Sequence, residues 1–388
     1  MNELIIPLLI VIFGIISLEI GMAAPIFEII AGLVGVNVFE LSDVPWIDFM
    51  ANFGILGLMF FAGLEVDKDV LRRNMGKGAV LGLASYLIPF AATFLVSLIL
   101  FSCDLKTAAL IGISLSTTSV ALVYPILKDL KLLSSEMGQT MFAGSVIVDV
   151  LSMISLTIIF GSITYWTIIF FTLTIVFMYH APRIGSLLFK RYRGNLAEIE
   201  LKFLLLIQIS LIFFSERIGV EKAVLAFILG FLFSEILEEH EEVAEKLRGI
   251  VFGFMSPIFF FKAGSLMKLS GISIYVVILT AAFILMAFTA KYLSASLILP
   301  RLAPEWKRWS KLAGAIFNFR LTFGLVSAVF GLQHGILTRE TYTAIVGTVI
   351  TTSLISSTII KMMEKTKADK RVKRARGDLN PQYRGLNL

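Results

Sequence analysis

The sequence predicts an all-α polytopic membrane protein with about 13 transmembrane helices, built as inverted repeats in which two discontinuous helices cross near the membrane midplane. Three observations predict this class: the apolar composition, the length of the apolar blocks, and two polar interruptions in equivalent spans. Of the 388 residues, 57% are hydrophobic and 16% are charged. Soluble domains are roughly 45–50% apolar and about 25% charged. The composition therefore excludes a soluble globular protein.

Apolar stretches separated by polar turns define the predicted helices, because about 20 apolar residues in a helix span the hydrocarbon core of a bilayer. The second stretch is short, and its separation from the first depends on Gly21 and Pro25. We expect residues 1–361 to form the transmembrane domain and residues 362–388 to form a basic cytoplasmic tail. The predicted spans are residues 4–22, 25–36, 50–66, 78–101, 107–127, 137–161, 164–180, 200–215, 221–236, 249–266, 272–299, 310–332 and 341–361.

The distribution of Lys and Arg predicts the orientation, since cytoplasmic loops carry an excess of both. The chain has 34 such residues and a net charge of +6. If the C-terminus is cytoplasmic, 26 of them lie inside, five lie outside and three lie within spans. We therefore expect a multi-pass protein of the cell membrane with its N-terminus outside and its C-terminus in the cytoplasm. The basic tail would contact anionic lipid, and we expect no nucleic-acid partner.

Two stretches in different halves of the chain resemble each other: LMFFAGLEVDKDVL from Leu58 and IFFFKAGSLMKLSG from Ile258. The predicted spans between them place the two stretches in opposite directions across the membrane. We therefore expect inverted repeats at about residues 50–161 and 250–361, an arrangement typical of secondary transporters.

The same spacing relates two polar interruptions inside apolar spans. The span 107–127 is interrupted by hydroxyl residues, and the span 310–332 is interrupted by Asn318, Arg320 and Thr322. Ser and Thr can simply bond back to their own helix and bend it. Because the two interruptions are equivalent, we instead expect discontinuous helices whose free backbone groups meet near the midplane and coordinate an ion. The hydroxyl residues are Ser114, Ser116, Thr117, Thr118 and Ser119.

Asp149 lies in the middle of the span 137–161, between Val148 and Val150. An ionised side chain at that depth costs about 2.5–3.5 kcal/mol on insertion scales and indicates function by default. Asp149 could serve only to pair with a buried cation and hold helices together. We favour a carboxylate that binds a cation and a proton in turn, since competition for one site is the minimum requirement for exchanging them.

Three basic side chains also fall within spans. Lys291 is far from both ends of its span, and Arg320 lies at the second interruption, where its charge could stabilise the carbonyl ends of half-helices or balance a carboxylate. We expect both to support the ion site. Lys262 lies near the outer end of its span and would extend toward the interface.

Other function classes lack their usual signatures. One cysteine, Cys103, and three histidines do not supply the ligands of a typical resident metal site. The sequence also contains no nucleotide-binding or hydrolase motif. We therefore expect no enzymatic activity and no cofactor, with transport driven by existing ion gradients.

Several segments occur in a characteristic order: FFAGLEVDKDVLRRN, SLSTTSVALVYPIL, VIVDV, SPIFFFKAG and the basic residue of the second interruption. In this order, over residues 1–361, the sequence resembles the monovalent cation:proton antiporter-2 family of bacteria and archaea. The resemblance implies the sodium/proton antiporter fold, with a core that moves against a static half, and a homodimer formed through that half. It also implies that the ion site contains Asp149 beside Thr117, Thr118 and Ser119, with Lys291 and Arg320 matching basic residues of the family.

Two departures from the family pattern bear on stoichiometry. Val148 stands where many members carry the first carboxylate of an Asp-Asp pair, and FRLT replaces Pro-Arg-Gly-Glu at the second interruption. With one titratable carboxylate, we expect one cation to be exchanged for one proton without net movement of charge. Lys291 lacks the carboxylate partner of the Asp-Asp members but could still exchange a proton itself.

Na⁺ is the expected cation, and three alternatives remain open. Hydroxyl and carbonyl oxygens serve K⁺ as well as Na⁺, so the sequence also permits K⁺/H⁺ exchange. The same architecture could support Na⁺-coupled uptake of an organic anion, with Arg320 or Lys262 binding its carboxylate. A regulated cation pore is the third alternative.

Overall fold

The computed structural model describes residues 2–41, 45–66, 68–161, 165–192, 194, 197–218, 222–270 and 273–377. These residues form helices and no β-strand, so the predicted all-α class is confirmed. The elements are α1 (Asn2–Ile20), α2 (Ala24–Val38), α3 (Pro45–Leu64), α4 (Lys68–Ile99), α5 (Leu105–Ser116), α6 (Val120–Asp129), α7 (Glu136–Phe160), α8 (Tyr165–Tyr192), α9 (Ile199–Ile218), α10 (Lys222–Glu239), α11 (Glu241–Ile250), the π-helical turn η1 (Val251–Met255), α12 (Ser256–Ser265), α13 (Ile274–Leu302), the 3₁₀ turn η2 (Pro304–Trp309), α14 (Ser310–Ile316), α15 (Phe323–Gln333) and α16 (Arg339–Gly377).

Each predicted span coincides with one helix or with consecutive helices of the described chain. Among the described residues, seven segments are long and apolar enough to cross a membrane, and α1, α2 and α15 are shorter apolar helices. The number of crossings therefore stays a prediction. Helix α16 extends past the predicted end at residue 361, because the residues that follow are mostly good helix formers and no Gly or Pro interrupts them before Gly377.

Side chains at two helix starts satisfy backbone N–H groups that have no partner within the helix. Asp104 precedes α5 and accepts from the amides of Lys106 at 3.0 Å and Thr107 at 3.2 Å. Hydrogen bonds from Thr107 hold the pKa of the Asp104 carboxyl below its usual range. Ser135 caps α7 in the same way, its Oγ accepting from the Gly138 amide at 3.1 Å. These caps define where two helices of the candidate site begin.

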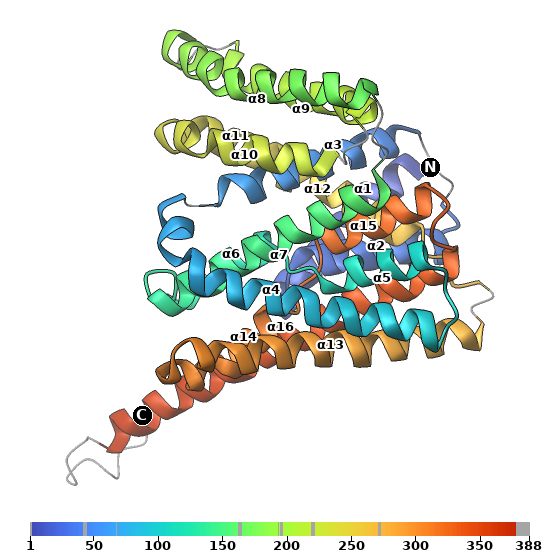
Figure 1. Cartoon of the computed structure of the whole chain (residues 1–388), viewed down its shortest axis with the longest axis vertical. Coiled ribbons are helices and arrows are strands. Elements are labelled where there is room, and N and C mark those ends of the chain that lie inside the picture. Colours follow the sequence, from blue (N-terminus) through green and yellow to red (C-terminus); the bar gives the residue numbers. More distant parts are fainter. Residues whose placement is uncertain are drawn as a thin grey trace.

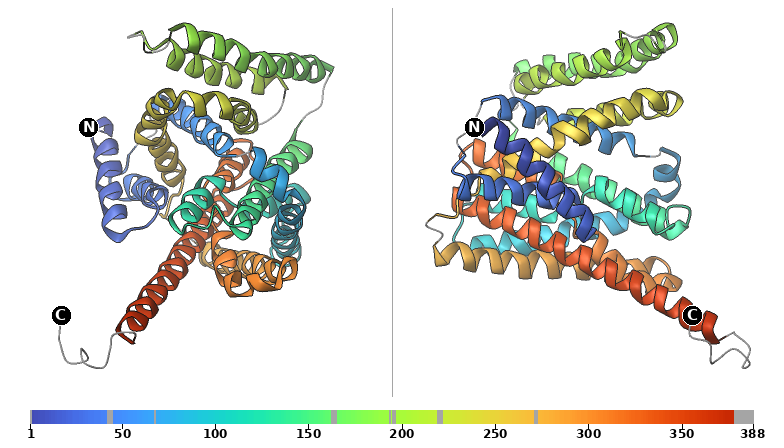
Figure 2. Two further views of the ribbon diagram at one scale, coloured as in Figure 1. Left: turned by 90° about the vertical axis from the view of Figure 1, so that its left-hand side faces the viewer. Right: turned by 180° about the vertical axis from the view of Figure 1, so that it is seen from behind.

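The helices pack into two groups (Figures 1 and 2). The first group, called the core, consists of α4–α7 and α13–α16; within it α4 packs against α5, α7 and α13, while α16 packs against α13, α14 and α15. The second group, called the panel, consists of α1–α3 and α10–α12, with α8 and α9 packed against α10. Figure 1 shows α8 and α9 at one edge of the molecule and α13 and α14 at the opposite edge.

Two close helix crossings build the panel, and each depends on a pair of glycines. Where α2 crosses α12, a Cβ atom on Gly32 would lie 1.8 Å from the Phe261 carbonyl oxygen, and one on Gly264 would lie 1.9 Å from the Ile29 carbonyl oxygen. No side chain fits in that space, so only glycine allows the two backbones to approach this closely.

Helices α3 and α10 cross in the same manner. A Cβ atom on Gly63 would lie 2.1 Å from the Phe227 carbonyl oxygen, and one on Gly230 would lie 1.9 Å from the Phe60 carbonyl oxygen. The panel is therefore held together by backbone contacts at both crossings.

The two crossings repeat along the sequence at the spacing that relates the two interrupted spans. Gly32 corresponds to Gly230, and Gly63 corresponds to Gly264. The glycine correspondence includes α2 and α10, which lie N-terminal to the predicted repeat boundaries at about residues 50 and 250; these boundaries stay a prediction.

Gly230→Ala tests the importance of the close approach. The added methyl group would meet the Phe60 carbonyl oxygen, so α3 and α10 would have to separate; overpacking of this kind costs about 1–3 kcal/mol. We expect a lower midpoint of thermal unfolding in detergent. Gly249→Ala is the matched control, because outside the adjacent residues and the backbone of its own helix no atom lies within 4 Å of its added methyl group. Equal midpoints for the two variants would contradict the role assigned to the crossing.

Candidate ion-binding site

Both predicted broken helices are present in the structure. The first break separates α5 from α6, and Thr117 adopts extended backbone angles there, with φ −65° and ψ 162°. The second break separates α14 from α15, and Thr322 just before α15 has φ −86° and ψ −90°. The hydroxyl cluster and the FNFRLT segment therefore interrupt their helices and do not merely bend them.

The two breaks contact each other directly. The Ser119 amide donates to the Phe319 carbonyl at 2.7 Å, and Thr118 Oγ1 donates to the Phe317 carbonyl at 3.0 Å. Thr322 Oγ1 donates to Ser119 Oγ at 3.0 Å. All these side chains are buried, so groups released by one interruption are satisfied by the other.

Asp149 reaches the first break from the middle of α7. Its side chain is 1% exposed, and Oδ2 accepts from the Val120 amide at 3.3 Å, at the start of α6. A carboxylate at a helix N-terminus is stabilised by the helix dipole and the free N–H groups. Oδ1 is buried and has no hydrogen-bond partner among the described residues. The carboxylate is therefore oriented by the break and keeps one oxygen available for a ligand.

Lys291 is fully buried in α13 and lies on the other side of the first break from the Asp149 contact. Its Nζ donates to the Ser85 carbonyl of α4 at 2.7 Å and to the Ser116 carbonyl at the end of α5. A cation at the C-terminal end of a helix interacts favourably with the helix dipole. Lys291 thus stabilises the carbonyl end of the first half-helix.

Arg320 is fully buried at the second break and also binds the end of α5. Its Nε donates to the Leu115 carbonyl at 2.6 Å. Nη2 donates to the Ala287 carbonyl and to Asn318 Oδ1, both at 2.8 Å, and Nη1 donates to Thr352 Oγ1 at 3.0 Å. In the described part of the chain its acceptors are carbonyl, amide and hydroxyl oxygens. Of the two roles that the sequence left open, Arg320 takes the stabilisation of carbonyl ends.

The structure brings most of the predicted site residues together. Thr118, Ser119, Asp149 and Arg320 meet at the two breaks, and Lys291 joins them through the end of α5. Thr117 differs, because its hydroxyl bonds back to the Ser114 carbonyl at 3.4 Å. Its oxygen also lies 2.9 Å from where a Cβ atom of Gly324 would stand, so it faces the start of α15.

Three contributors to this region were missed by sequence reasoning. The Val120 amide and the Ser85 carbonyl are backbone groups, and residue type says nothing about where they point. Thr352 is one of several Thr and Ser residues in an apolar stretch of α16, and nothing in the sequence distinguishes it from the others. The fold alone assigns them to the site.

Lys262 does not simply extend to the interface as expected. Its Nζ pairs with Asp48 Oδ1 at 2.8 Å, and its side chain is only 10% exposed. The pair joins α12 to α3 within the panel, away from the contact between the two breaks.

Comparison with known proteins agrees with the geometry. The profile of the family described as "Sodium/hydrogen exchanger, transmembrane" matches residues 5–366. The chain is 28% identical over 363 residues to "Probable Na(+)/H(+) antiporter 3" of Methanocaldococcus jannaschii, covering 89% of this chain and 90% of that protein. It is 25% identical over 361 residues to "Na(+)/H(+)-K(+) antiporter GerN" of Bacillus cereus, covering 90% and 92%.

A solved structure supports the fold. The sodium proton antiporter MjNhaP1 of Methanocaldococcus jannaschii, determined at pH 8, matches with a TM-score of 0.64 and 16% identity. The match covers 93% of this chain and 97% of MjNhaP1. The predicted fold is therefore confirmed, as is the predicted resemblance to cation:proton antiporters. The chain belongs to the transmembrane sodium/hydrogen exchanger family.

Proposed function

We propose that this protein exchanges a monovalent cation, foremost Na⁺, for protons by alternating access, and that Asp149 is the single carboxylate that carries either ion. The observation that carries the proposal is the position of Asp149 at the contact of two broken helices. One of its oxygens accepts from the Val120 amide, and the other is buried without a partner among the described residues. Two relatives are named Na⁺/H⁺ antiporters, in keeping with this assignment.

The proposed exchange follows from competition at one group. A buried carboxylate needs a compensating positive charge, which either a proton or a cation supplies. Thr118 and Ser119 place hydroxyl oxygens beside the break, which suit Na⁺ or K⁺ as neutral ligands. Because one carboxylate cannot hold both ions, loading one displaces the other.

The packing of the two helix groups supports motion as rigid halves. In the panel, glycines bring α2 against α12 and α3 against α10. In the core, a Cβ atom on Gly82 of α4 would lie 2.7 Å from the Gly144 carbonyl oxygen of α7. Among the described glycines, these close backbone contacts all lie within one half. Across the halves, Gly21 lies only near the flexible end of the Lys361 side chain. The core can therefore shift against the panel without breaking the tightest contacts.

Electroneutral exchange is the stoichiometry we propose. Val148, next to the ion-binding residue, is apolar, and Lys291 and Arg320 donate to carbonyl oxygens that stabilise their charged forms. If both stay charged, the site carries the same net charge with a proton as with Na⁺. Because the core then carries the same charge in both directions, the membrane potential does no net work over a complete cycle.

We also propose a location, an orientation and an oligomeric state for the exchanger. We place the protein in the cell membrane with its N-terminus outside and its C-terminus in the cytoplasm, as the distribution of Lys and Arg indicates. We propose a homodimer formed through the panel, which would leave the core free to move. K⁺/H⁺ exchange is the second candidate, because the name of GerN includes both Na⁺ and K⁺.

Symport of an organic anion has less support than exchange. Arg320 directs its donors to carbonyl, amide and hydroxyl oxygens of the fold, and Lys262 is paired with Asp48. An incoming carboxylate would have to displace these contacts.

Asp149→Asn tests the proposed carboxylate. The amide cannot release a proton or offset the charge of a cation, so we expect proton movement driven by a Na⁺ gradient to fall to the level of empty vesicles. Asp129→Asn, at the exposed end of α6, is the matched control and should retain exchange. Persistent exchange in the Asp149→Asn protein would remove Asp149 from the mechanism.

Exchange by the wild-type protein with Na⁺, Li⁺ and K⁺ tests cation choice and stoichiometry. The rate in reconstituted vesicles would be measured with the membrane potential clamped at zero and then imposed. We expect Na⁺ to support exchange and the rate to be insensitive to the potential. A strong response of the wild-type rate to the potential would refute electroneutral exchange.

Val148→Asp tests the effect of a second carboxylate beside Asp149. Two titratable carboxylates with one cation would move net charge in each cycle, so we expect the exchange rate to become dependent on the membrane potential. Val148→Asn is the control, because it adds a polar side chain of similar size without a charge. If both variants respond to the potential alike, the carboxylate count does not determine the stoichiometry.

A further inference from the structure

A small cavity lies where the panel meets the core at the far end of α15. Its lining includes Asp48 and Asn52 of α3, Lys262 and Ala263 of α12, and Val329 and Gln333 of α15. Its volume is about 20 Å³, enough for a single water molecule. Two panel helices and one core helix therefore enclose a space that is closed to a hydrated ion in this conformation.

Helix α15 connects this cavity to the candidate ion site. It begins at Phe323, directly after the second break, and ends at Gln333, which lines the cavity. A helix of this length spans about 16 Å. Separation of α15 from α3 and α12 would therefore open a path from this face of the protein toward Asp149.

The cavity wall contains a buried positive charge that would oppose a cation on this path. The Lys262 side chain is 10% exposed, while that of Asp48 is 51% exposed, and their ion pair measures 2.8 Å. Asp48 lies in the first turn of α3, where the helix dipole stabilises a carboxylate. Beside Lys262, Tyr342 of α16 donates its hydroxyl to the Ala263 carbonyl at 2.7 Å, so this end of α12 contacts the core in this conformation. The carboxylate thus offsets the lysine charge at the mouth of the path.

We propose that the Asp48–Lys262 pair balances the charge of an access vestibule for the transported cation, and that Asp48 determines how readily Na⁺ enters from this face. The proposal rests on the exchange function proposed above and adds residues outside the ion site. In the predicted orientation this face is extracellular. Asp48 and Lys262 act here as positioning residues, since they influence the cation before it reaches Asp149.

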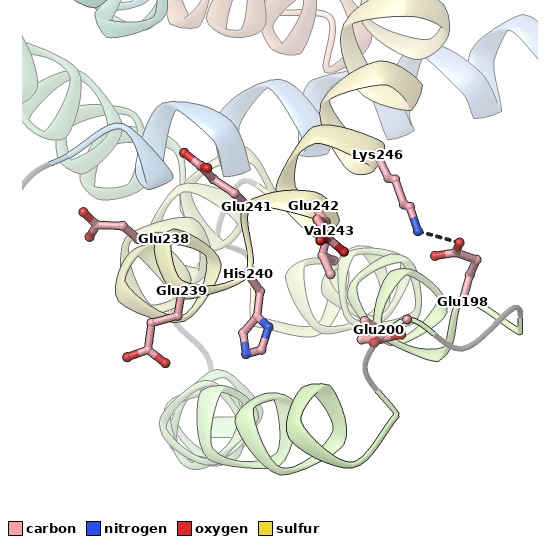
Figure 3. A pocket seen from close by; sticks show the side chains of 10 residues that line it. Glu198, Glu200, Glu238, Glu239, His240, Glu241, Glu242, Val243 and Lys246 are labelled. Carbon is pink, nitrogen blue, oxygen red and sulfur yellow. Dashed lines mark hydrogen bonds and ion pairs between the residues drawn. The ribbon is translucent and has the colours of Figure 1, made fainter.

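The opposite end of the panel serves as the control region for the Asp48–Lys262 pair (Figure 3). A larger cavity of about 260 Å³ lies there, lined by several glutamates, His240 and Lys246. Lys246 pairs with Glu198 at 2.6 Å, and both side chains are solvent-accessible. Lys246 and Lys262 lie on the continuous segment α11–η1–α12, about 24 Å apart along its axis. Because the residues lining this larger cavity come from α9 to α11 and the loop before α9, movement of α15 would leave it unchanged.

The first experiment compares four variants: Asp48→Asn, Lys262→Gln, the double variant, and Glu198→Gln as the control. Oriented proteoliposomes would receive Na⁺ on the face that carries Asp48, at low and high concentrations of choline chloride. We expect Asp48→Asn to raise the apparent KM for Na⁺ about threefold at low ionic strength, the effect of one unit charge at a few ångströms in water. The kcat should not change, because the chemistry at Asp149 is untouched.

The other variants test whether the KM changes in the direction that the charge predicts. Lys262→Gln should lower the apparent KM, and the double variant should return it close to the wild-type value. All these differences should shrink at high ionic strength, where the screening length falls to about 3 Å at 1 M salt. A folding defect cannot lower a KM, so the Lys262→Gln result separates electrostatics from structural damage. An unchanged KM in both single variants, or the same changes in Glu198→Gln, would overturn the proposal.

A second experiment measures the electrostatic potential in the vestibule without measuring transport. Cys103 is the chain's single cysteine, so Cys103→Ser provides a background in which Gln333→Cys can be labelled alone. The reaction rates of a cationic and an anionic thiol reagent of equal size would be compared. We expect Asp48→Asn to slow the cationic reagent and to speed the anionic one, each about threefold at low ionic strength. Glu198→Gln should alter neither rate.

Thiol labelling tests the vestibule, and the exchange assay tests the proposed ion carrier, so failure of one can be told from failure of the other. An unchanged ratio of labelling rates in the Asp48→Asn protein would refute the vestibule even if exchange by the wild type is intact. Conversely, exchange that survives Asp149→Asn would remove the proposed ion carrier, while a changed labelling ratio would still support the vestibule electrostatics.

Discussion

The hydrogen bond from the Ser119 amide to the Phe319 carbonyl joins the two broken helices, and the rest of the site depends on the constraint behind it. A break within a membrane protein frees backbone donors and acceptors that lipid cannot satisfy. The two extended segments satisfy part of this need for each other. The remaining helix ends are met by charged side chains: Asp149 at the start of α6, and Lys291 with Arg320 at the end of α5. The buried charged side chains therefore have a structural role at the helix ends, apart from the exchange chemistry proposed for Asp149.

This distribution of charges makes Asp149 different from the two basic residues. Lys291 and Arg320 donate to several oxygens of the fold, so their donor groups already have partners. Asp149 receives one backbone hydrogen bond at 3.3 Å and keeps a buried oxygen without a partner among the described residues. A carboxylate in that position is incompletely compensated until it gains a proton or a cation. The same requirement is the physical basis for the ion exchange proposed at Asp149.

The division into core and panel is consistent with the relative movement of helix groups that the proposed exchange requires. Glycine pairs hold helices of the panel at backbone contact, and the α4–α7 contact does the same in the core. The polar breaks are confined to the core, while two ion pairs of the panel, Asp48 with Lys262 and Glu198 with Lys246, lie near its opposite ends. The proposed ion site and the proposed vestibule charges thus lie in different parts of the molecule, which is consistent with one part moving past the other.

The sequence by itself determined the helical class, the positions of the two breaks and the charged side chains that lie within the apolar spans. Hydropathy and residue type are local properties, and the hydroxyl cluster before Val120 and the polar residues around Arg320 could be read without knowing their neighbours. Only the tertiary structure decided which groups these residues meet. Arg320 binds a carbonyl 205 positions away, and Lys262 pairs with Asp48 from another helix. Such partners depend on which helices cross and at what depth. The glycines that permit the closest crossings were indistinguishable in sequence from those that face open space.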